Sequence, residues 1–148
     1  MIGQTQRTFR LRLERRIGAR RERVFRAFTT SEDLRRWSAP VGLDVVDGSV
    51  DLRVGGRWSV VMRDATRGVD FHAAGEYREI VPPERLVFTH RWLSDPTPVE
   101  TVVTVELHED GDATRVVMTH DGFLGEDVRD GHREGWSSCL DQLERLVA

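Results

Sequence analysis

Apolar and polar residues alternate along much of this chain, and the first clear case is FRLRLERRI, which begins at Phe9. Phe9, Leu11, Leu13 and Ile17 share one face, while the residues between them are charged. A period of two residues is typical of a strand with one buried face. Arg15 interrupts the apolar face, and we interpret it as the point where the strand leaves the core.

Two short helices are expected after this strand. The segment RRERVFRAF places its apolar residues at helical spacing. In TTSEDLRRW, Thr30 or Ser31 can cap a second helix, in which Leu34 and Trp37 lie on one face. Pro40 then ends this helix, because proline cannot donate a backbone hydrogen bond.

No long helical pattern appears between residues 43 and 120, and strands separated by turns are predicted instead. Turns are indicated by Gly55-Gly56, by two consecutive prolines after Val81, and by the DGD sequence after Glu109. Ala73 and Gly75 are small and face inward, which favours empty volume near the centre of the sheet. The expected strands are a weak one at 43–54, then RWSVVM, residues 71–80, RLVFTHRW, residues 101–109 and TRVVMTH.

The period changes to that of a helix near the C-terminus, over about 20 residues. One stripe of this helix is formed by Val128, His132, Trp136, Cys139, Leu140, Leu143 and Val147. An apolar stripe on a long helix and an apolar face on a sheet bury one another. We therefore expect an α+β fold in a single domain over residues 1–148. A curved antiparallel sheet of six to seven strands wraps around the C-terminal helix, and two short helices follow the first strand.

Composition and charge exclude several classes of protein. The 148 residues are 39% hydrophobic with a net charge of −3, which is a globular balance and argues against nucleic acid as a partner. Apolar runs stay short of the roughly 18 residues needed to cross a bilayer, and the first residues lack the apolar core of a leader. Cys139 is the single cysteine, so a cytoplasmic protein without disulfides is expected.

Three histidines are candidates for chemistry, because all of them are expected to face the interior. His90 lies on an apolar strand face, His120 ends a strand, and His132 lies on the helix stripe. They could be hydrogen-bonded core residues, they could orient a ligand, or one could act as a general base near neutral pH.

Metal and nucleophile sites are not predicted. His120 and Asp121 are consecutive in an extended segment and point to opposite faces, while Asp130 and Glu134 lie on the far side of the helix from His132. Cys139 in the middle of an apolar stripe reads as an inert buried thiol. We expect neither a metal nor a cofactor.

Several segments resemble the SRPBCC or START-like superfamily, which has the helix-grip fold. These are RERVFRAFTTSEDLRRWSAP, DLRVGGRWSV, GEYREIVPPERLVFTHRW, TVVTVELHEDGDATRVVMTHDGF and GWSSCLDQLERLV. Within the superfamily, the chain is similar to the bacterial branch homologous to the activator of the large heat-shock chaperone's ATPase. The segments follow the order of the family and cover nearly the whole chain.

This resemblance implies a hydrophobic cavity between the sheet and the long helix, and no catalytic residue set shared across the family. Its members include binders of lipids and small molecules, polyketide cyclases and stress-associated proteins. The chaperone-activating role belongs to larger eukaryotic proteins with an additional N-terminal domain, for which 148 residues leave no room.

The leading hypothesis is a protein that binds a hydrophobic small molecule with a polar end. The alternatives are a cyclase or dehydratase using His or Tyr as acid and base, and a stress or chaperone-associated protein acting through its surface. An exposed sheet edge would also allow a homodimer. The residues expected to line the ligand site are Trp37, Trp58, Val60, Met62, Phe71, Ala73, Tyr77, Phe88, His90, Trp92, Met118, His120, His132, Trp136, Cys139 and Leu140.

Overall fold

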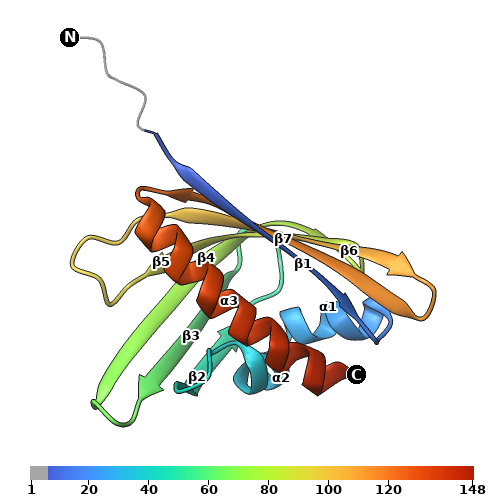
Figure 1. Ribbon diagram of the computed structural model, residues 1–148, viewed down its shortest axis with the longest axis horizontal. Coiled ribbons are helices and arrows are strands. Elements are labelled where there is room, and N and C mark those ends of the chain that lie inside the picture. Colours follow the sequence, from blue (N-terminus) through green and yellow to red (C-terminus); the bar gives the residue numbers. More distant parts are fainter. Residues whose placement is uncertain (1–6) are drawn as a thin grey trace.

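Seven antiparallel strands form one open sheet, and a long helix runs across one face of it (Figure 1). The structure is a computed structural model that describes residues 7–148. The elements are β1 (Phe9–Ile17), α1 (Arg21–Thr29), α2 (Ser31–Trp37), β2 (Asp44–Val50), β3 (Arg57–Asp64), β4 (Val69–Val81), β5 (Arg85–Trp92), β6 (Thr101–Asp110), β7 (Ala113–Phe123) and α3 (Glu126–Val147). The order across the sheet is β1-β7-β6-β5-β4-β3-β2. The predicted order and type of the elements are confirmed.

Residues 1–6, where the sequence predicts no leader, lie outside the described residues. In the described part, none of the helices combines the length and the apolar character that crossing a bilayer requires.

Strand β1 confirms the predicted alternation, with Leu11 and Ile17 fully buried. The interpretation of Arg15 is wrong, because this residue does not mark the end of the buried face. Its guanidinium lies on that face and reaches α3, where Nη1 pairs with Asp141 Oδ1 at 2.6 Å. A long side chain can cover apolar surface with its methylene groups while its charged end reaches a partner.

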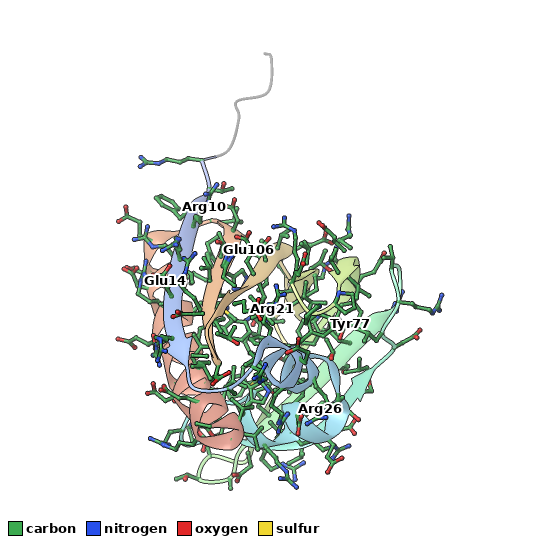
Figure 2. All side chains as sticks on the ribbon, turned by 90° about the vertical axis from the view of Figure 1, so that its right-hand side faces the viewer. Arg10, Glu14, Arg21, Arg26, Tyr77 and Glu106 are labelled. Atoms are coloured by element: carbon green, nitrogen blue, oxygen red, sulfur yellow. The ribbon has the colours of Figure 1, made fainter. Side chains whose placement is uncertain are left out.

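The outer face of the sheet carries the alternating charges of β1 and β7, and Figure 2 shows Arg10 and Glu14 along β1. Arg10 pairs with Asp121 at 3.4 Å, and Glu14 pairs with Arg115 at 2.9 Å. Exposed pairs of this kind contribute little to stability. Because each of these arginines is paired with an acid, this part of the outer face does not carry charge of one sign.

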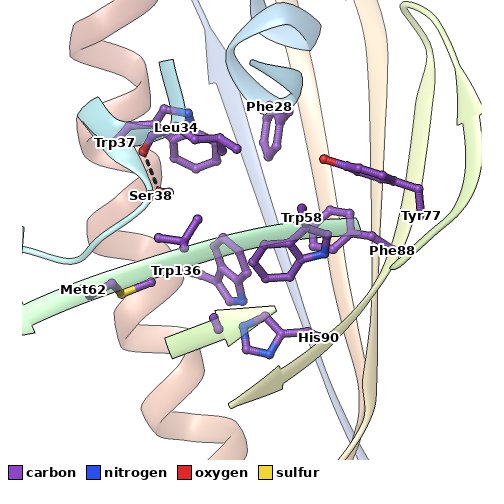
Figure 3. A pocket seen from close by; sticks show the side chains of 12 residues that line it. Phe28, Leu34, Trp37, Ser38, Trp58, Met62, Tyr77, Phe88, His90 and Trp136 are labelled. Carbon is purple, nitrogen blue, oxygen red and sulfur yellow. Dashed lines mark hydrogen bonds between the residues drawn. The ribbon is translucent and has the colours of Figure 1, made fainter. Parts of the chain in front are cut away.

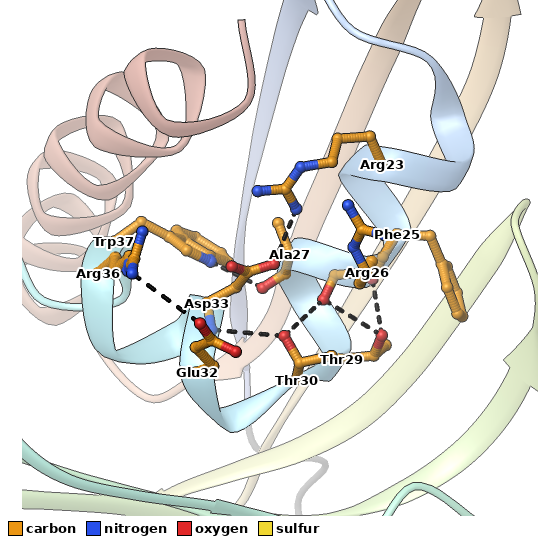
Figure 4. Close-up of polar contacts among 10 residues, drawn as sticks. All are labelled: Arg23, Phe25, Arg26, Ala27, Thr29, Thr30, Glu32, Asp33, Arg36 and Trp37. Carbon is orange, nitrogen blue, oxygen red and sulfur yellow. Dashed lines mark hydrogen bonds and ion pairs between the residues drawn. The ribbon is translucent and has the colours of Figure 1, made fainter.

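Helices α1 and α2 are tied together and close one end of the sheet (Figures 1 and 4). Thr30 caps α2 by accepting a hydrogen bond from the backbone N–H of Asp33, so the predicted cap is Thr30 rather than Ser31. Asp33 also pairs with Arg23 of α1 at 2.8 Å. The indole N–H of Trp37 donates to the Ala27 carbonyl at 2.8 Å. These contacts fix the position of Trp37 in the core.

The predicted stripe of α3 is buried only in the C-terminal half of the helix. Cys139, Leu140 and Leu143 are buried, whereas Val128 is 53% exposed. The prediction that Val128 is buried is wrong. The N-terminal half of α3 lies over an open groove instead of the packed core, which positions the site described next.

Candidate functional site

Two adjoining hollows lie between α3 and the inner face of the sheet. The inner cavity has a volume of about 50 Å³, and its walls come from both short helices, from β3, β4 and β5, and from α3 (Figure 3). Its lining consists of Phe28, Leu34, Trp37, Ser38, Trp58, Val60, Met62, Ala73, Tyr77, Phe88, His90 and Trp136.

The outer groove has a volume of about 490 Å³ and opens beside the N-terminal half of α3. Ser38, Met62, His90 and Trp136 line both hollows, so the groove and the cavity adjoin at these four side chains. The remaining groove residues are Pro40, Leu43, Phe71, Trp92, Asp95, Val128, Gly131, His132, Gly135 and Cys139.

The predicted site residues divide between these hollows and the core. Nine line the inner cavity, namely Trp37, Trp58, Val60, Met62, Ala73, Tyr77, Phe88, His90 and Trp136. Phe71, Trp92, His132 and Cys139 line the groove. Met118, His120 and Leu140 line neither hollow, because each is at most 1% exposed and packs inside the core. Their inward orientation was predicted correctly, but inward orientation alone does not place a residue at a hollow.

The expectation of empty volume near the centre of the sheet holds at Ala73, which lines the inner cavity of about 50 Å³, but is wrong at Gly75, where the space is filled. A Cβ atom added at Gly75 would overlap the carbonyl oxygen of Thr89 and the indole nitrogen of Trp58. The glycine therefore admits the Trp58 ring, whose N–H donates to Thr89 O at 3.1 Å. A small residue here allows close packing rather than a void.

Other lining residues were missed by sequence reasoning. Phe28 belongs to α1 and Leu34 to α2, Ser38 directly follows α2, and Pro40 and Leu43 lie in the loop after it. Helical periodicity alone gives no indication of which sheet strands a helix end will approach.

Gly131 and Gly135 were also missed, although a signal was present. They lie one turn apart inside α3 and both line the groove. A glycine inside a helix costs about 1 kcal/mol relative to alanine. Two such residues on one helix face indicate that space is needed beside that face.

All four tryptophan N–H groups are used inside the protein. Trp37 and Trp58 donate to backbone carbonyls, and Trp92 and Trp136 donate to histidines, each at 2.9 Å. These indoles therefore offer their ring faces to the hollows and no free donor.

His132 is held in one neutral form. Its Nε2 accepts from the indole of Trp92, which can only donate, so this nitrogen carries no proton. Its Nδ1 lies 2.8 Å from the Val128 carbonyl and must carry the proton that donates to it. Partial burial lowers the pKa of His132, in keeping with a neutral ring.

His120 is held in the opposite neutral form. Its Nδ1 accepts from the Trp136 indole, so its Nε2 carries the proton and donates to Thr101 Oγ1 at 2.6 Å. The Thr101 hydroxyl in turn donates to the backbone carbonyl of His90 at 3.1 Å. Burial, followed by the neighbouring His90 and His132, lowers the pKa of His120 to about 2.

His90 differs from the other two histidines, because its ring nitrogens have no hydrogen-bond partner among residues 7–148. The side chain is 5% exposed and lines both hollows. Arg21 Nε is the one fully buried side-chain nitrogen or oxygen without a partner in the described chain, so the His90 nitrogens retain some contact with open space. Burial, and then the nearby His132, lowers the pKa of His90 to about 3.

Tyr77, like His90, is a polar residue that lines the inner cavity and has no hydrogen-bond partner among the described residues. Its hydroxyl makes no hydrogen bond to the described residues, and Figure 3 shows it pointing inward, toward Phe28. The residue is 2% exposed. Burial, and then the charge of Asp51, raises the pKa of Tyr77, so the phenol keeps its proton at neutral pH.

The site is suited to hydrogen bonding in an uncharged environment. None of the inner cavity residues carries a formal charge, and Asp95 is the one acidic residue of the groove. Burial raises the pKa of the Cys139 thiol to about 12, which makes it a poor nucleophile. Within the described part of the chain, no group of three or more His, Cys, Asp or Glu side chains is arranged to hold a metal ion.

A seven-stranded antiparallel sheet that grips a long C-terminal helix over a hollow defines a helix-grip domain. The chain belongs to the family described as "Activator of Hsp90 ATPase homolog 1-like protein", whose model matches residues 18–148. The predicted superfamily and bacterial branch are therefore confirmed. This fold is that of a ligand-binding domain, and the family match carries that general assignment to this chain.

Solved structures of bacterial proteins have the same fold. A protein from Chromobacterium violaceum is 28% identical, has a TM-score of 0.86, and is covered over 96% of its length by 93% of this chain. The AHSA1 protein from Silicibacter pomeroyi is 28% identical, with a TM-score of 0.82 and the same coverages. The Mll3558 protein from Rhizobium loti is 33% identical, with a TM-score of 0.79 and again 93% and 96% coverage. The chain has no match among curated proteins.

Proposed function

We propose that this protein binds a small, largely apolar molecule whose body lies in the outer groove and whose tip enters the inner cavity. The observation that carries the proposal is that the two hollows adjoin and share four lining residues, Ser38, Met62, His90 and Trp136. The groove, at about 490 Å³, has the size of a typical ligand site, whereas the inner cavity, at about 50 Å³, admits only a few atoms.

The two glycines of α3 support this proposal. A Cβ atom added at Gly131 or Gly135 would meet nothing within 4 Å, so packing does not exclude a side chain at either position. The helix nevertheless forgoes roughly 1 kcal/mol of propensity at each of them. Keeping the groove open to a ligand would explain why glycine, with its lower helix propensity, stands at both positions.

The test is a blocking substitution that leaves the fold intact. Gly135→Leu places a side chain in the groove, while Glu134→Leu adds the same side chain to the neighbouring, exposed position as a matched control. Titration calorimetry with naphthol as the probe should show at least about tenfold weaker binding for Gly135→Leu and unchanged binding for Glu134→Leu. Equal affinity of the two variants would place the probe elsewhere and contradict the proposal.

The natural ligand requires a separate measurement. Native mass spectrometry of the protein purified from its own host should reveal a bound small molecule that Gly135→Leu fails to retain. Equal retention by both proteins would contradict binding in the groove.

A cyclase or dehydratase is less well supported by the same geometry. A general base works best with a pKa near the working pH. Burial lowers the pKa of His90 to about 3, and both ring nitrogens of His120 and of His132 are already engaged. The hollows therefore favour holding a molecule over transferring its protons.

Association with a chaperone is an independent hypothesis, suggested by the name of the family. A pull-down with the Hsp90-type chaperone of the host tests it. Absence of retention at micromolar concentrations would count against it without affecting the groove.

A further inference from the structure

His90 and Tyr77 are two buried polar groups that face the inner cavity without a partner in the described residues. Their polar atoms are not sealed, because Arg21 Nε is the one fully buried side-chain nitrogen or oxygen without a partner in the described residues, so both groups can still hydrogen-bond to a molecule in the cavity. Ser38, also in the lining, already donates its hydroxyl to the Leu34 carbonyl. The tip of the ligand is therefore the natural partner for the first two groups.

Aromatic rings connect these two polar groups along the wall of the cavity. The ring centroids of Tyr77 and Phe88 lie 6.3 Å apart, those of Phe88 and Trp58 lie 5.5 Å apart, and those of Trp58 and His90 also lie 5.5 Å apart. His90 lines the groove as well, so it stands at the junction of the two hollows, and Tyr77 stands further in (Figure 3). A tip that enters from the groove meets His90 first.

The cavity has nothing to neutralise a charged tip. Its lining contains no Arg, Lys, Asp or Glu, and the neutral His90 ring offers one donor and one acceptor. A carboxylate or phosphate placed here would lose its hydration without gaining an opposite charge, which costs several kcal/mol. An uncharged hydroxyl or carbonyl loses far less and can bond to His90 and Tyr77.

We infer that the ligand carries an uncharged polar head group, of the phenol, alcohol or ketone class, which enters the inner cavity and hydrogen-bonds to His90, and that the site rejects anionic head groups. This inference rests on the proposed binding function and specifies the ligand class. Fatty acids and phosphorylated metabolites are thereby excluded as head-first occupants.

Calorimetry at neutral pH with naphthalene, naphthol and naphthoate, which share one ring system, compares no head group, an uncharged polar head group and an anionic head group. Naphthol should bind at least about fivefold more tightly than naphthalene, because its hydroxyl can hydrogen-bond to His90. Naphthoate should bind at least about tenfold more weakly than naphthol, because its carboxylate loses hydration without gaining an opposite charge. Binding of naphthoate as tight as that of naphthol would overturn the head-group inference and leave the groove proposal standing. Binding of none of the three would contradict the proposed function itself.

Variants at His90 test whether this residue causes the preference for a ligand with a polar head group. His90→Leu breaks no hydrogen bond of the ring within the described residues and should lower the affinity for naphthol roughly fivefold, without changing that for naphthalene. His90→Gln keeps an uncharged donor and acceptor and should retain part of the preference. His108→Leu, on the outer face of β6, is the matched control. An unchanged preference for naphthol over naphthalene in His90→Leu would overturn the role of His90.

Discussion

The indole N–H of Trp136 on α3 donates to Nδ1 of His120 on β7 across 2.9 Å. A second pair runs in the opposite sense, from Trp92 on β5 to His132 on α3, also across 2.9 Å. The helix thus contributes one donor and one acceptor, and the sheet contributes the complementary two. These pairs fasten the N-terminal half of α3, which has few buried apolar residues of its own.

Trp136→Phe should lower the free energy of unfolding by about 1–3 kcal/mol, because it leaves Nδ1 of the fully buried His120 without a donor. Trp92→Phe should cost less, since His132 is only half-buried and water can replace the lost indole. Urea unfolding of both variants checks the difference. A larger loss of unfolding free energy for Trp92→Phe than for Trp136→Phe would show that burial of the histidine does not decide how much each pair stabilises the fold.

Acid should destabilise the protein through its buried histidines. The folded pKa values of His90 and His120, about 3 and about 2, lie below the ordinary value of 6.5 that applies in the unfolded chain. Above pH 6.5 both states are neutral, and these residues add no dependence on pH. Below pH 6.5 these histidines bind protons in the unfolded state but stay neutral in the folded state. The free energy of unfolding therefore falls by roughly 1.4 kcal/mol per pH unit for each histidine.

Chemical unfolding between about pH 6.5 and about pH 3 measures this slope. His90→Gln removes one titrating group and should make the slope shallower by the contribution of one proton. Identical slopes in His90→Gln and the parent would show that His90 is not neutral in the fold.

Gly75→Ala should prevent folding or destabilise the protein by several kcal/mol. Its added methyl would overlap the backbone of Thr89, which the sheet holds in place. Gly18→Ala is the contrasting change, because a Cβ atom there meets nothing within 4 Å, and it should alter stability only slightly. Circular dichroism melts of the two variants make the comparison, and a well-folded Gly75→Ala protein would contradict the close packing described for Trp58.

Gly131→Ala should raise stability by up to about 1 kcal/mol and weaken ligand binding at the same time. The gain follows from helix propensity, and the loss follows from the methyl group entering the groove. Denaturation and calorimetry with naphthol measure the two effects in one variant. Higher stability with unchanged affinity would show that Gly131 does not contact the ligand.

The sequence alone determined the order of the elements and the face that each presents to the interior. The alternation in FRLRLERRI and the stripe in the C-terminal helix follow from local geometry, which a linear pattern records directly. The motif segments also indicated the family, because their order and content cover nearly the whole chain.

Tertiary structure decided where along each inward face space remains. Val128 and Leu140 belong to one stripe of α3, yet Val128 borders the groove and Leu140 is buried in the core. The C-terminal half of α3 is covered by the chain that follows α2, to which Ser138 and Gln142 hydrogen-bond. Gly75 likewise admits a tryptophan ring from β3 instead of leaving a void. A periodic pattern gives the direction of a side chain but not the distance to the element opposite, and that distance separates a packed core from a binding site.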